Sequence, residues 1–270
     1  MNDKWRLVQT QPSDGAWNMA VDEAILESVS RGDSLPTLRL YGWAPPCLSL
    51  GYAQPIADVD RKALQARGWG LVRRPTGGRA ILHTDELTYA VIAPVSEPRV
   101  TGSVLESYRR LSQALLLALQ KLGLQPNADR EYPQTNAGGP VCFETPSNYE
   151  ITIAGKKLIG SAQARRREGV LQHGSLPLHG DLTRITQGLK FADEAARLQA
   201  SERLLEHATT VEIGLGRVIG WEQAANAFVE GFQEALAIDF VPSELTSNER
   251  VRADELTRTQ YGNDSWNARI

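Results

Sequence analysis

Apolar side chains recur along the chain at two spacings, one typical of strands and one typical of helices. Apolar and polar residues alternate over several short segments, and many of these are separated by Gly, Pro or polar turns. These segments predict strands at 4–10, 37–43, 47–52, 69–73, 79–82, 87–93, 149–153, 157–163 and 170–178. Longer segments with apolar residues every three or four positions predict helices at 14–32, 58–67, 104–122, 193–205, 222–236 and 243–259.

The order of these elements indicates an α+β fold with mixed, largely antiparallel sheets flanked by helices. Adjacent strands are often joined by short turns, which argues against a regular βαβ array. We expect a single domain over residues 1–270, with a mainly helical C-terminal part from about residue 190. The segment 104–122 carries the clearest helical face, formed by Leu105, Tyr108, Leu111, Leu115, Leu119 and Leu122.

Composition narrows the class of protein but does not identify it. The chain has 270 residues, 41% hydrophobic and 23% charged, which is typical of a globular protein. We find no apolar stretch near the roughly 20 residues that a membrane helix needs, and no signal-peptide pattern at the start. A formal net charge of -3 argues against a general nucleic-acid binder. We therefore expect a cytoplasmic protein without nucleic-acid or membrane partners, and a monomer.

The two cysteines have different surroundings in the sequence. They are too few for a disulfide scaffold, and together with the four histidines they show no zinc-site spacing, so we expect no metal. Cys47 lies in an apolar strand and is expected to pack in the core. Cys142 follows a polar loop, 125–140, and is either a buried small side chain or a nucleophile.

A nucleophilic thiol needs a nearby cation that stabilises its thiolate. The nearest cations after Cys142 are Lys156 and Lys157, which follow a predicted turn at Ala154 and Gly155. That turn would return the next strand toward the cysteine loop. Because side chains alternate along a strand, one of the two lysines is expected to point inward.

A second candidate site is the glycine loop, the segment LVRRPTGGRAILH at residues 71–83. Gly77 and Gly78 permit close approach of the backbone, whose N–H groups suit an oxyanion or a carboxylate, although many such segments are plain hairpins. The segment matches neither a Walker loop nor a GxGxxG fingerprint. Arg73, Arg74 and Arg79 give it a basic character in a chain that is acidic overall.

Three further features have both a structural and a functional interpretation. Gly160 and Ser161 are small residues, suited to a crowded site or to close strand packing. Arg165 to Arg167 form either a solvated hairpin tip or a docking patch for an acidic partner. His83 and His173 are either core histidines with satisfied partners or members of a site.

Several segments taken together resemble a known superfamily. RRPTGGRAILH, ELTYAV, VCFETPSNYEI and GKKLIGSAQARRREGVLQHGSLPL occur in this order, preceded by NMAVDEAIL and followed by YGNDSWN. The set is similar to the lipoate-protein ligase, biotin-ligase and octanoyltransferase superfamily, and most similar to its cysteine-dependent octanoyltransferase branch of Gram-positive type. The resemblance covers almost the whole chain and implies the catalytic fold of this superfamily.

The resemblance also implies roles for particular residues. It matches Cys142 to the nucleophile and Lys157 to the lysine that lies beside the acyl thioester. It matches Arg74, Gly77, Gly78 and His83 to the loop that holds the acyl group, and we add Gly160, Ser161 and His173 as further substrate-binding candidates. The implied reaction needs no cofactor.

The implied reaction moves octanoyl from octanoyl-acyl carrier protein to a lysine of a lipoyl domain, such as glycine cleavage H protein or the acyltransferase subunit of a 2-oxoacid dehydrogenase. Two departures favour transferase over ATP-dependent ligase. Arg79 stands where such ligases have a third loop glycine, and the ligases do not need the cysteine. An aspartate often follows the loop histidine in the transferases, whereas Thr84 follows here, and Asp85 comes one residue later.

Three functions remain open from the sequence. The first is the cysteine acyltransferase. The second is an ATP-dependent lipoate or octanoate ligase, or an amidotransferase between lipoyl-domain proteins. The third is a non-catalytic lipoyl- or acyl-binding protein.

Overall fold

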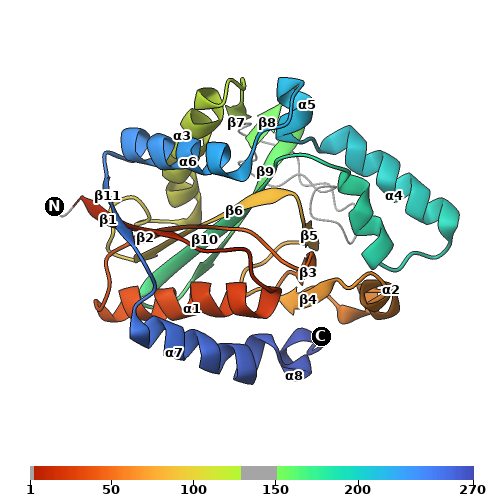
Figure 1. Ribbon diagram of the computed structural model, residues 1–270, viewed down its shortest axis with the longest axis horizontal. Coiled ribbons are helices and arrows are strands. Elements are labelled where there is room, and N and C mark those ends of the chain that lie inside the picture. Colours follow the sequence, from red (N-terminus) through yellow and green to blue (C-terminus); the bar gives the residue numbers. More distant parts are fainter. Residues whose placement is uncertain (1–2, 129–150) are drawn as a thin grey trace.

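The computed structural model describes residues 3–128 and 151–270, which form two sheets and their covering helices (Figure 1). The larger sheet has the strand order β11-β1-β2-β6-β10-β9-β8-β7, and the smaller has the order β4-β3-β5. The strands are β1 (Lys4–Gln9), β2 (Thr37–Tyr41), β3 (Cys47–Leu50), β4 (Gly70–Arg73), β5 (Ile81–His83), β6 (Glu86–Pro94), β7 (Asn127–Ala128), β8 (Ile151–Ile153), β9 (Lys156–Arg165), β10 (Gly169–Pro177) and β11 (Asp239–Ser243).

Most of the strand pairs are antiparallel, as the sequence predicts. The exceptions in the described part of the chain are β1 with β11, β1 with β2, and β3 with β4, which run parallel. The central strands β6 and β10 are buried along nearly their whole length. This arrangement confirms the predicted α+β class with mixed, largely antiparallel sheets.

Helices cover both faces of the larger sheet (Figure 1). The helices are α1 (Gly15–Arg31), α2 (Arg61–Ala66), α3 (Val104–Lys121), α4 (Glu194–His207), α5 (Val211–Leu215), α6 (Trp221–Leu236), α7 (Ser247–Leu256) and α8 (Asp264–Asn267). Short 3-10 segments lie at Ile56–Asp58 and Leu182–Gly188, and a π-helical turn lies at Thr257–Tyr261.

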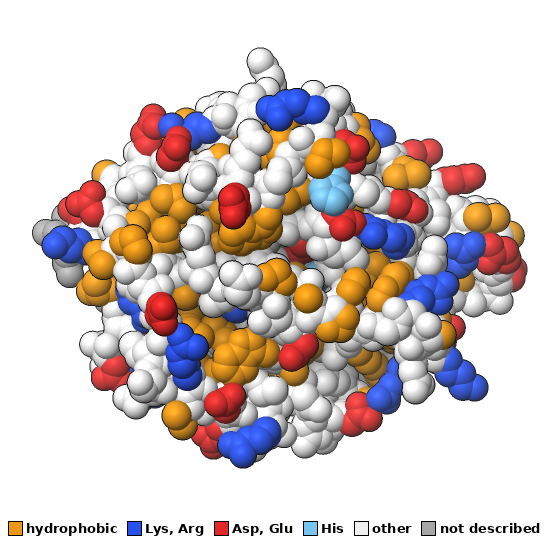
Figure 2. Space-filling view, in the orientation of Figure 1, with side chains coloured by type: hydrophobic (Ala, Val, Ile, Leu, Met, Phe, Trp, Pro, Cys, Tyr) orange, Lys and Arg blue, Asp and Glu red, His pale blue; other side chains and the backbone are white. Residues whose placement is uncertain are grey.

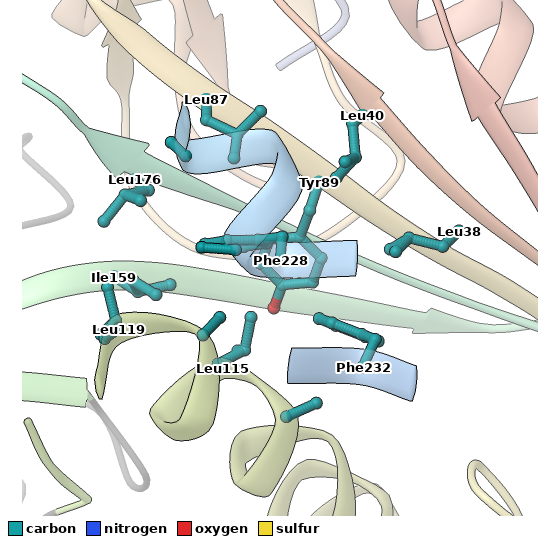
Figure 3. Close-up of a cluster of buried hydrophobic side chains, with 14 of the residues drawn as sticks. Leu38, Leu40, Leu87, Tyr89, Leu115, Leu119, Ile159, Leu176, Phe228 and Phe232 are labelled. Carbon is teal, nitrogen blue, oxygen red and sulfur yellow. The ribbon is translucent and has the colours of Figure 1, made fainter. Parts of the chain in front are cut away.

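Two apolar cores follow from this layering, because residues of one strand alternate between its faces. Leu38 and Leu40 of β2 face the core under α3 and α6, which Figure 3 shows around Tyr89, Phe228 and Phe232. Tyr41, the next residue of β2, belongs instead to the core under α1 and α7. A third, smaller core lies between the β4-β3-β5 sheet and the segments that cover it.

Local sequence signals account for the ends of the two helices nearest the cavity described below. The Asp14 carboxylate accepts from the Trp17 N–H, and Gly32 ends the helix in the left-handed region, at φ 78°. Ser103 and Glu106 form a reciprocal capping box at the start of α3. Both helices therefore begin where their capping residues predict.

One strand was not predicted, and the start of one predicted helix was wrong. Residues 239–243 form β11, a strand at the edge of the sheet. The sequence pattern did not indicate this strand because it contains Pro242, and proline is tolerated in edge strands but argues against a strand in a sequence. The helix predicted at 243–259 begins only at Ser247, with Thr246 as its cap. The division of the chain near residue 190 stays a prediction.

The apolar face predicted for α3 is not buried along its whole length. Leu111, Leu115 and Leu119 are buried, whereas Leu105 at the helix start is 39% exposed. None of the helices in the described ranges combines the length and the apolar character that a membrane crossing requires.

Candidate active site

A cavity of about 580 Å³ lies where the glycine loop meets β9, β10 and the start of α3. Its volume is in the range of small-molecule and cofactor sites. Its lining includes every described candidate from the sequence: Arg74, Gly77, Gly78, His83, Lys157, Gly160, Ser161 and His173. Residues far apart in the chain therefore meet at one site.

Arg74 fixes the shape of the glycine loop. Its guanidinium donates to the carbonyl oxygens of Gly77 and Arg79, both at 2.8 Å, and to the carbonyl and hydroxyl oxygens of Ser49. Gly78 has φ 95°, and its carbonyl lies so close to Gly51 that a Cβ there would come within 1.9 Å of it. The loop is thus held from both sides before any ligand binds.

His83 lies in the cavity wall with both ring nitrogens engaged. Its Nδ1 is 2.8 Å from a Glu86 carboxylate oxygen, and its Nε2 is 2.8 Å from the Ser49 hydroxyl. The ring stacks on Trp43, with centroids 3.9 Å apart. Burial raises the pKa of the Glu86 carboxyl. The opposing effects are larger, because His83 lowers this pKa through its charge and its hydrogen bond, and the hydroxyls of Ser175 and Thr88 lower it through theirs. The net result is a lowered pKa.

Asp85, by contrast, pairs with Arg184 at the other side of this segment. The carboxylate that holds His83 is therefore Glu86, three residues after it, and not Asp85. Sequence reasoning missed Glu86, whose one local signal is its position three residues after His83, and it missed the contacts of Trp43 and Ser49, which come from distant parts of the chain.

His173 joins the glycine loop to the buried interior. Its Nε2 is 2.7 Å from the Thr76 hydroxyl, and its Nδ1 is 3.3 Å from the Asp22 carboxylate. Asp22 also accepts from Arg39 at 2.6 Å and from the Tyr41 hydroxyl at 3.0 Å. Burial lowers the pKa of His173 more than the Asp22 carboxylate raises it. Sequence reasoning did not find Thr76 or Asp22, because no local signal links them to His173.

The two lysines after the turn point to different surroundings, as the alternation of strand side chains predicts. Lys157 is buried, 4% exposed, and lines the cavity. Lys156 instead donates to the Leu205 carbonyl at 2.5 Å. The Lys157 backbone is also fixed, because its carbonyl accepts from the Thr209 N–H at 3.0 Å.

Gly160 and Ser161 lie in β9 beside a close backbone approach. The Ser161 hydroxyl is 2.7 Å from the Tyr89 hydroxyl, and a Cβ on Gly174 of β10 would come within 2.8 Å of Tyr89, Ser161 and Gly160 atoms. Burial raises the pKa of Tyr89 to about 12, so this phenol remains a neutral hydrogen-bonding group. Gly174 is a cavity residue that sequence reasoning missed, although it stands beside His173.

The structure describes one of the two cysteines. Cys47 is 1% exposed in the core under α1, and burial raises the pKa of its thiol. This confirms that Cys47 is a packing residue. Cys142 lies outside the described residues, as does the polar loop beyond residue 128.

The arginine run 165–167 lies at the turn between β9 and β10. Arg165 donates to the Val100 carbonyl, Arg166 is 3.4 Å from Glu23, and Arg167 is 3.3 Å from Glu168. Figure 2 shows basic and acidic side chains interspersed on the face it displays. These contacts favour the solvated hairpin tip over a docking patch.

No cluster of three or more His, Cys, Asp or Glu side chains within residues 3–128 and 151–270 is arranged to hold a metal ion. The polar groups that line the cavity include two histidines, a lysine and two arginines, and they suit an acyl carbonyl and its reacting partners.

Comparison with known proteins agrees with this geometry. A model of the lipoyl protein ligase A/B catalytic domain matches residues 14–233. Octanoyltransferase LipM of Kyrpidia tusciae is 44% identical over 98% of both chains, and that of Symbiobacterium thermophilum is 42% identical over the full length of both.

Two solved structures share the fold. One is a bipartite lipoate protein ligase from Thermoplasma acidophilum, studied with its E2 lipoyl domain, with 27% identity, a TM-score of 0.82, and coverage of 99% of this chain and 96% of that one. The other is lipoate-protein ligase A bound with ATP, with 26% identity, a TM-score of 0.80 and 98% coverage of both chains. The chain belongs to the lipoyl protein ligase A/B catalytic domain family. The predicted superfamily and fold are thereby confirmed.

Proposed function

We propose that the chain is an octanoyltransferase of lipoate biosynthesis that forms a thioester on Cys142 and passes the acyl group to a lysine of a lipoyl domain. Curated relatives that are 38–44% identical over 97–100% of this chain are named octanoyltransferases, which supports octanoyl transfer. The single observation that carries the mechanism is the cavity itself, in which buried Lys157 shares one space with the glycine loop and with apolar walls.

The proposed reaction consists of two successive acyl transfers. The Cys142 thiolate attacks the carbonyl of the octanoyl thioester on acyl carrier protein, a new C–S bond forms, and the carrier leaves as its thiolate, which takes up a proton. The amine of the acceptor lysine then attacks the Cys142 thioester. A C–N bond forms, the Cys142 sulfur leaves as a thiolate, and the proton lost by the amine passes to Lys157.

Lys157 is suited to both steps. As an ammonium group it stabilises the Cys142 thiolate, and as a neutral amine it accepts the proton of the incoming lysine. The segment that holds Cys142 precedes β8, which begins at Ile151 and pairs with this lysine's strand, β9, through Thr152 and Lys157. Cys142 is nine residues from Ile151, so the chain length permits the approach.

The other candidate residues divide into two roles. Backbone N–H groups of Gly77, Gly78 and Gly160 bind the oxyanion of the tetrahedral intermediate, whereas Arg74, His83, Ser161 and His173 fix the walls that position them. The acyl chain lies against apolar side chains of the cavity, which include Met19, Ile81 and Ile159. Each buried methylene contributes about 0.8 kcal/mol to binding.

The acceptor is the lipoyl domain of a protein such as glycine cleavage H protein or a 2-oxoacid dehydrogenase subunit. The Thermoplasma acidophilum ligase, which has the same fold, was studied with an E2 lipoyl domain. We propose that the chain acts as a monomer in the cytoplasm and uses no cofactor.

The test is a transfer assay with octanoyl-acyl carrier protein and an apo lipoyl domain, in the absence of ATP. We expect the wild-type chain to octanoylate the domain, Cys142→Ala to lose this activity by at least a thousandfold, and Cys47→Ala to retain it. Equal activity of Cys142→Ala and the wild type would exclude the thioester mechanism.

An ATP-dependent ligase is the second candidate, favoured by the structural similarity to lipoate-protein ligase A bound with ATP. It predicts that free octanoate plus ATP modifies the domain and that Cys142→Ala retains this activity. Binding of acyl groups without transfer in either assay would instead indicate a non-catalytic relative.

A further inference from the structure

Arg79 differs from its two arginine neighbours in the glycine loop. Arg73 is buried and donates to the carbonyls of Gly51 and Gln54, and the Arg74 guanidinium donates to loop carbonyls. Arg79 is half-buried and lines the cavity, yet its guanidinium has no hydrogen bond or ion pair to any other residue in the described ranges. Two of the three arginines build the loop, and the third is available to a ligand.

The backbone at Arg79 is nevertheless fixed. Its carbonyl accepts from Arg74 at 2.8 Å, and the next residue, Ala80, is buried in the small core. The direction in which the side chain leaves the loop is therefore set by the fold.

Exposure places Arg79 at the open end of the cavity. The adjoining Gly77 and Gly78 are exposed, and a Cβ added to Gly77 would meet no atom within 4 Å. On the facing helix α3, Val104 and Leu105 line the same cavity and are 47% and 39% exposed. His83 and His173 at the other end are buried. The side chain of Arg79 therefore lies on the more exposed side of the cavity lining.

We propose that Arg79 binds the phosphodiester of the donor's phosphopantetheine arm and so selects a carrier-bound thioester over a simple one. This inference rests on the proposed function, because it takes the donor to be an acyl carrier protein. The arm carries its thioester at one end and its phosphate at the other. When the thioester carbonyl lies inside the cavity, the phosphate lies toward the mouth.

The chemistry of the two partners favours this assignment. A guanidinium presents a planar set of donors that matches phosphate oxygens. The acceptor lysine, in contrast, carries no anionic group that a guanidinium would bind. Arg79 therefore discriminates between donors and not between acceptors.

The test compares two soluble donors, octanoyl-phosphopantetheine and octanoyl-pantetheine, which differ by the phosphate. We measure kcat/KM for transfer to the apo lipoyl domain with the wild type, Arg79→Gln and Arg79→Lys. The matched control is Arg167→Gln, whose side chain is 95% exposed at the β9–β10 turn. Urea unfolding of each variant checks that the fold is unchanged.

We expect the wild type and Arg167→Gln to prefer the phosphorylated donor by about tenfold or more, as a charge-assisted hydrogen bond implies. Arg79→Gln should lose this preference through a lower kcat/KM for octanoyl-phosphopantetheine alone, and Arg79→Lys should recover part of it. An equal loss with both donors, or no loss with either, would overturn the proposal.

Calorimetric binding of phosphopantetheine without an acyl group separates this proposal from the proposed function. Weaker binding by Arg79→Gln than by the wild type is expected even if no transfer occurs. If the wild type transfers octanoyl from neither donor nor from the intact carrier protein, the proposed function fails, and equal binding by the two proteins would overturn the phosphate site as well.

Discussion

The interior and the mouth of the cavity are built differently. In the interior, His83 contacts Glu86 and Ser49, and His173 contacts Asp22 and Thr76, so every ring nitrogen has a protein partner. At the mouth, Gly77 faces open space and Leu105 is 39% exposed. The histidines of the interior are therefore already paired within the protein, whereas the residues at the mouth are accessible to a ligand.

This difference separates the energetic roles of the two regions. A change in the interior should reduce the free energy of unfolding, because it leaves buried groups without partners or overfills a packed site. A change at the mouth should leave folding intact and alter catalysis.

The largest expected effect is at Glu86, which accepts hydrogen bonds from Ser175 and Thr88 besides its contact with His83. Glu86→Ala removes the acceptor and should lower the free energy of unfolding by about 3–5 kcal/mol, measured by urea denaturation. The control is Glu168→Ala, a surface carboxylate 60% exposed, with an expected change within about 0.5 kcal/mol. Similar losses in the two variants would contradict the interior account.

A pair of glycines gives the next effect. Gly174→Ala should cost about 1–3 kcal/mol of stability, because its Cβ would come within 2.8 Å of three neighbouring atoms. Gly77→Ala meets no atom within 4 Å and should keep the stability within about 0.5 kcal/mol, measured by the same denaturation.

The same Gly77→Ala variant should nevertheless lose octanoyl transfer by tenfold or more, because the new methyl group lies where the acyl carbonyl approaches the loop. Wild-type activity in Gly77→Ala would show that the ligand does not approach this part of the loop.

A smaller effect concerns pH. The folded chain lowers the pKa of His173 from its usual 6.5, so the unfolded chain binds the proton more readily. The stability contributed by this group is present above pH 6.5 and is lost as the pH falls from there toward the lowered pKa. Between pH 7.5 and 5.5, unfolding in urea should therefore show a decrease in stability.

His173→Gln should reduce that decrease, and His207→Gln, which alters an exposed histidine, should retain it. An unchanged pH dependence in His173→Gln would show that another group titrates in this window.

The smallest effect on stability is expected at Leu105. Leu105→Ser should change the free energy of unfolding by no more than about 0.5 kcal/mol, because the side chain is already partly exposed. It should raise KM for octanoyl and butanoyl donors by the same factor in the transfer assay, because the mouth contacts the arm of the donor and not the end of its acyl chain. Leu119→Ala, on the buried part of the same helix, should instead cost about 2–5 kcal/mol.

Much of the fold could be predicted because its signals are local. Asp14 and Gly32 delimit α1, and strand alternation gave the central strands that carry the site. β11 could not be found in this way, since Asp239–Ser243 is short, contains proline and is defined by pairing with β1.

The sequence indicated which residues line the site, but it did not indicate how they contact one another. The sequence indicated His83 and Lys157, but the stacking of Trp43 on His83 and the reach of His173 to Asp22 join segments that are far apart in the chain. The Arg79 guanidinium has no hydrogen bond or ion pair within the described residues, and this too depends on the tertiary structure. Nothing in the run Arg73, Arg74 and Arg79 distinguishes loop-building arginines from one that faces the cavity.

The most direct test of the account is to identify the residue that carries the octanoyl group during turnover. The wild-type chain is mixed with octanoyl-acyl carrier protein without acceptor, quenched in acid, digested and analysed by tandem mass spectrometry. The account predicts a hydroxylamine-sensitive octanoyl group on Cys142, which disappears when apo lipoyl domain is added before the quench. An octanoyl group on Cys47 or Lys157, or modification of the domain with no enzyme-bound octanoyl group at any time point, would contradict it.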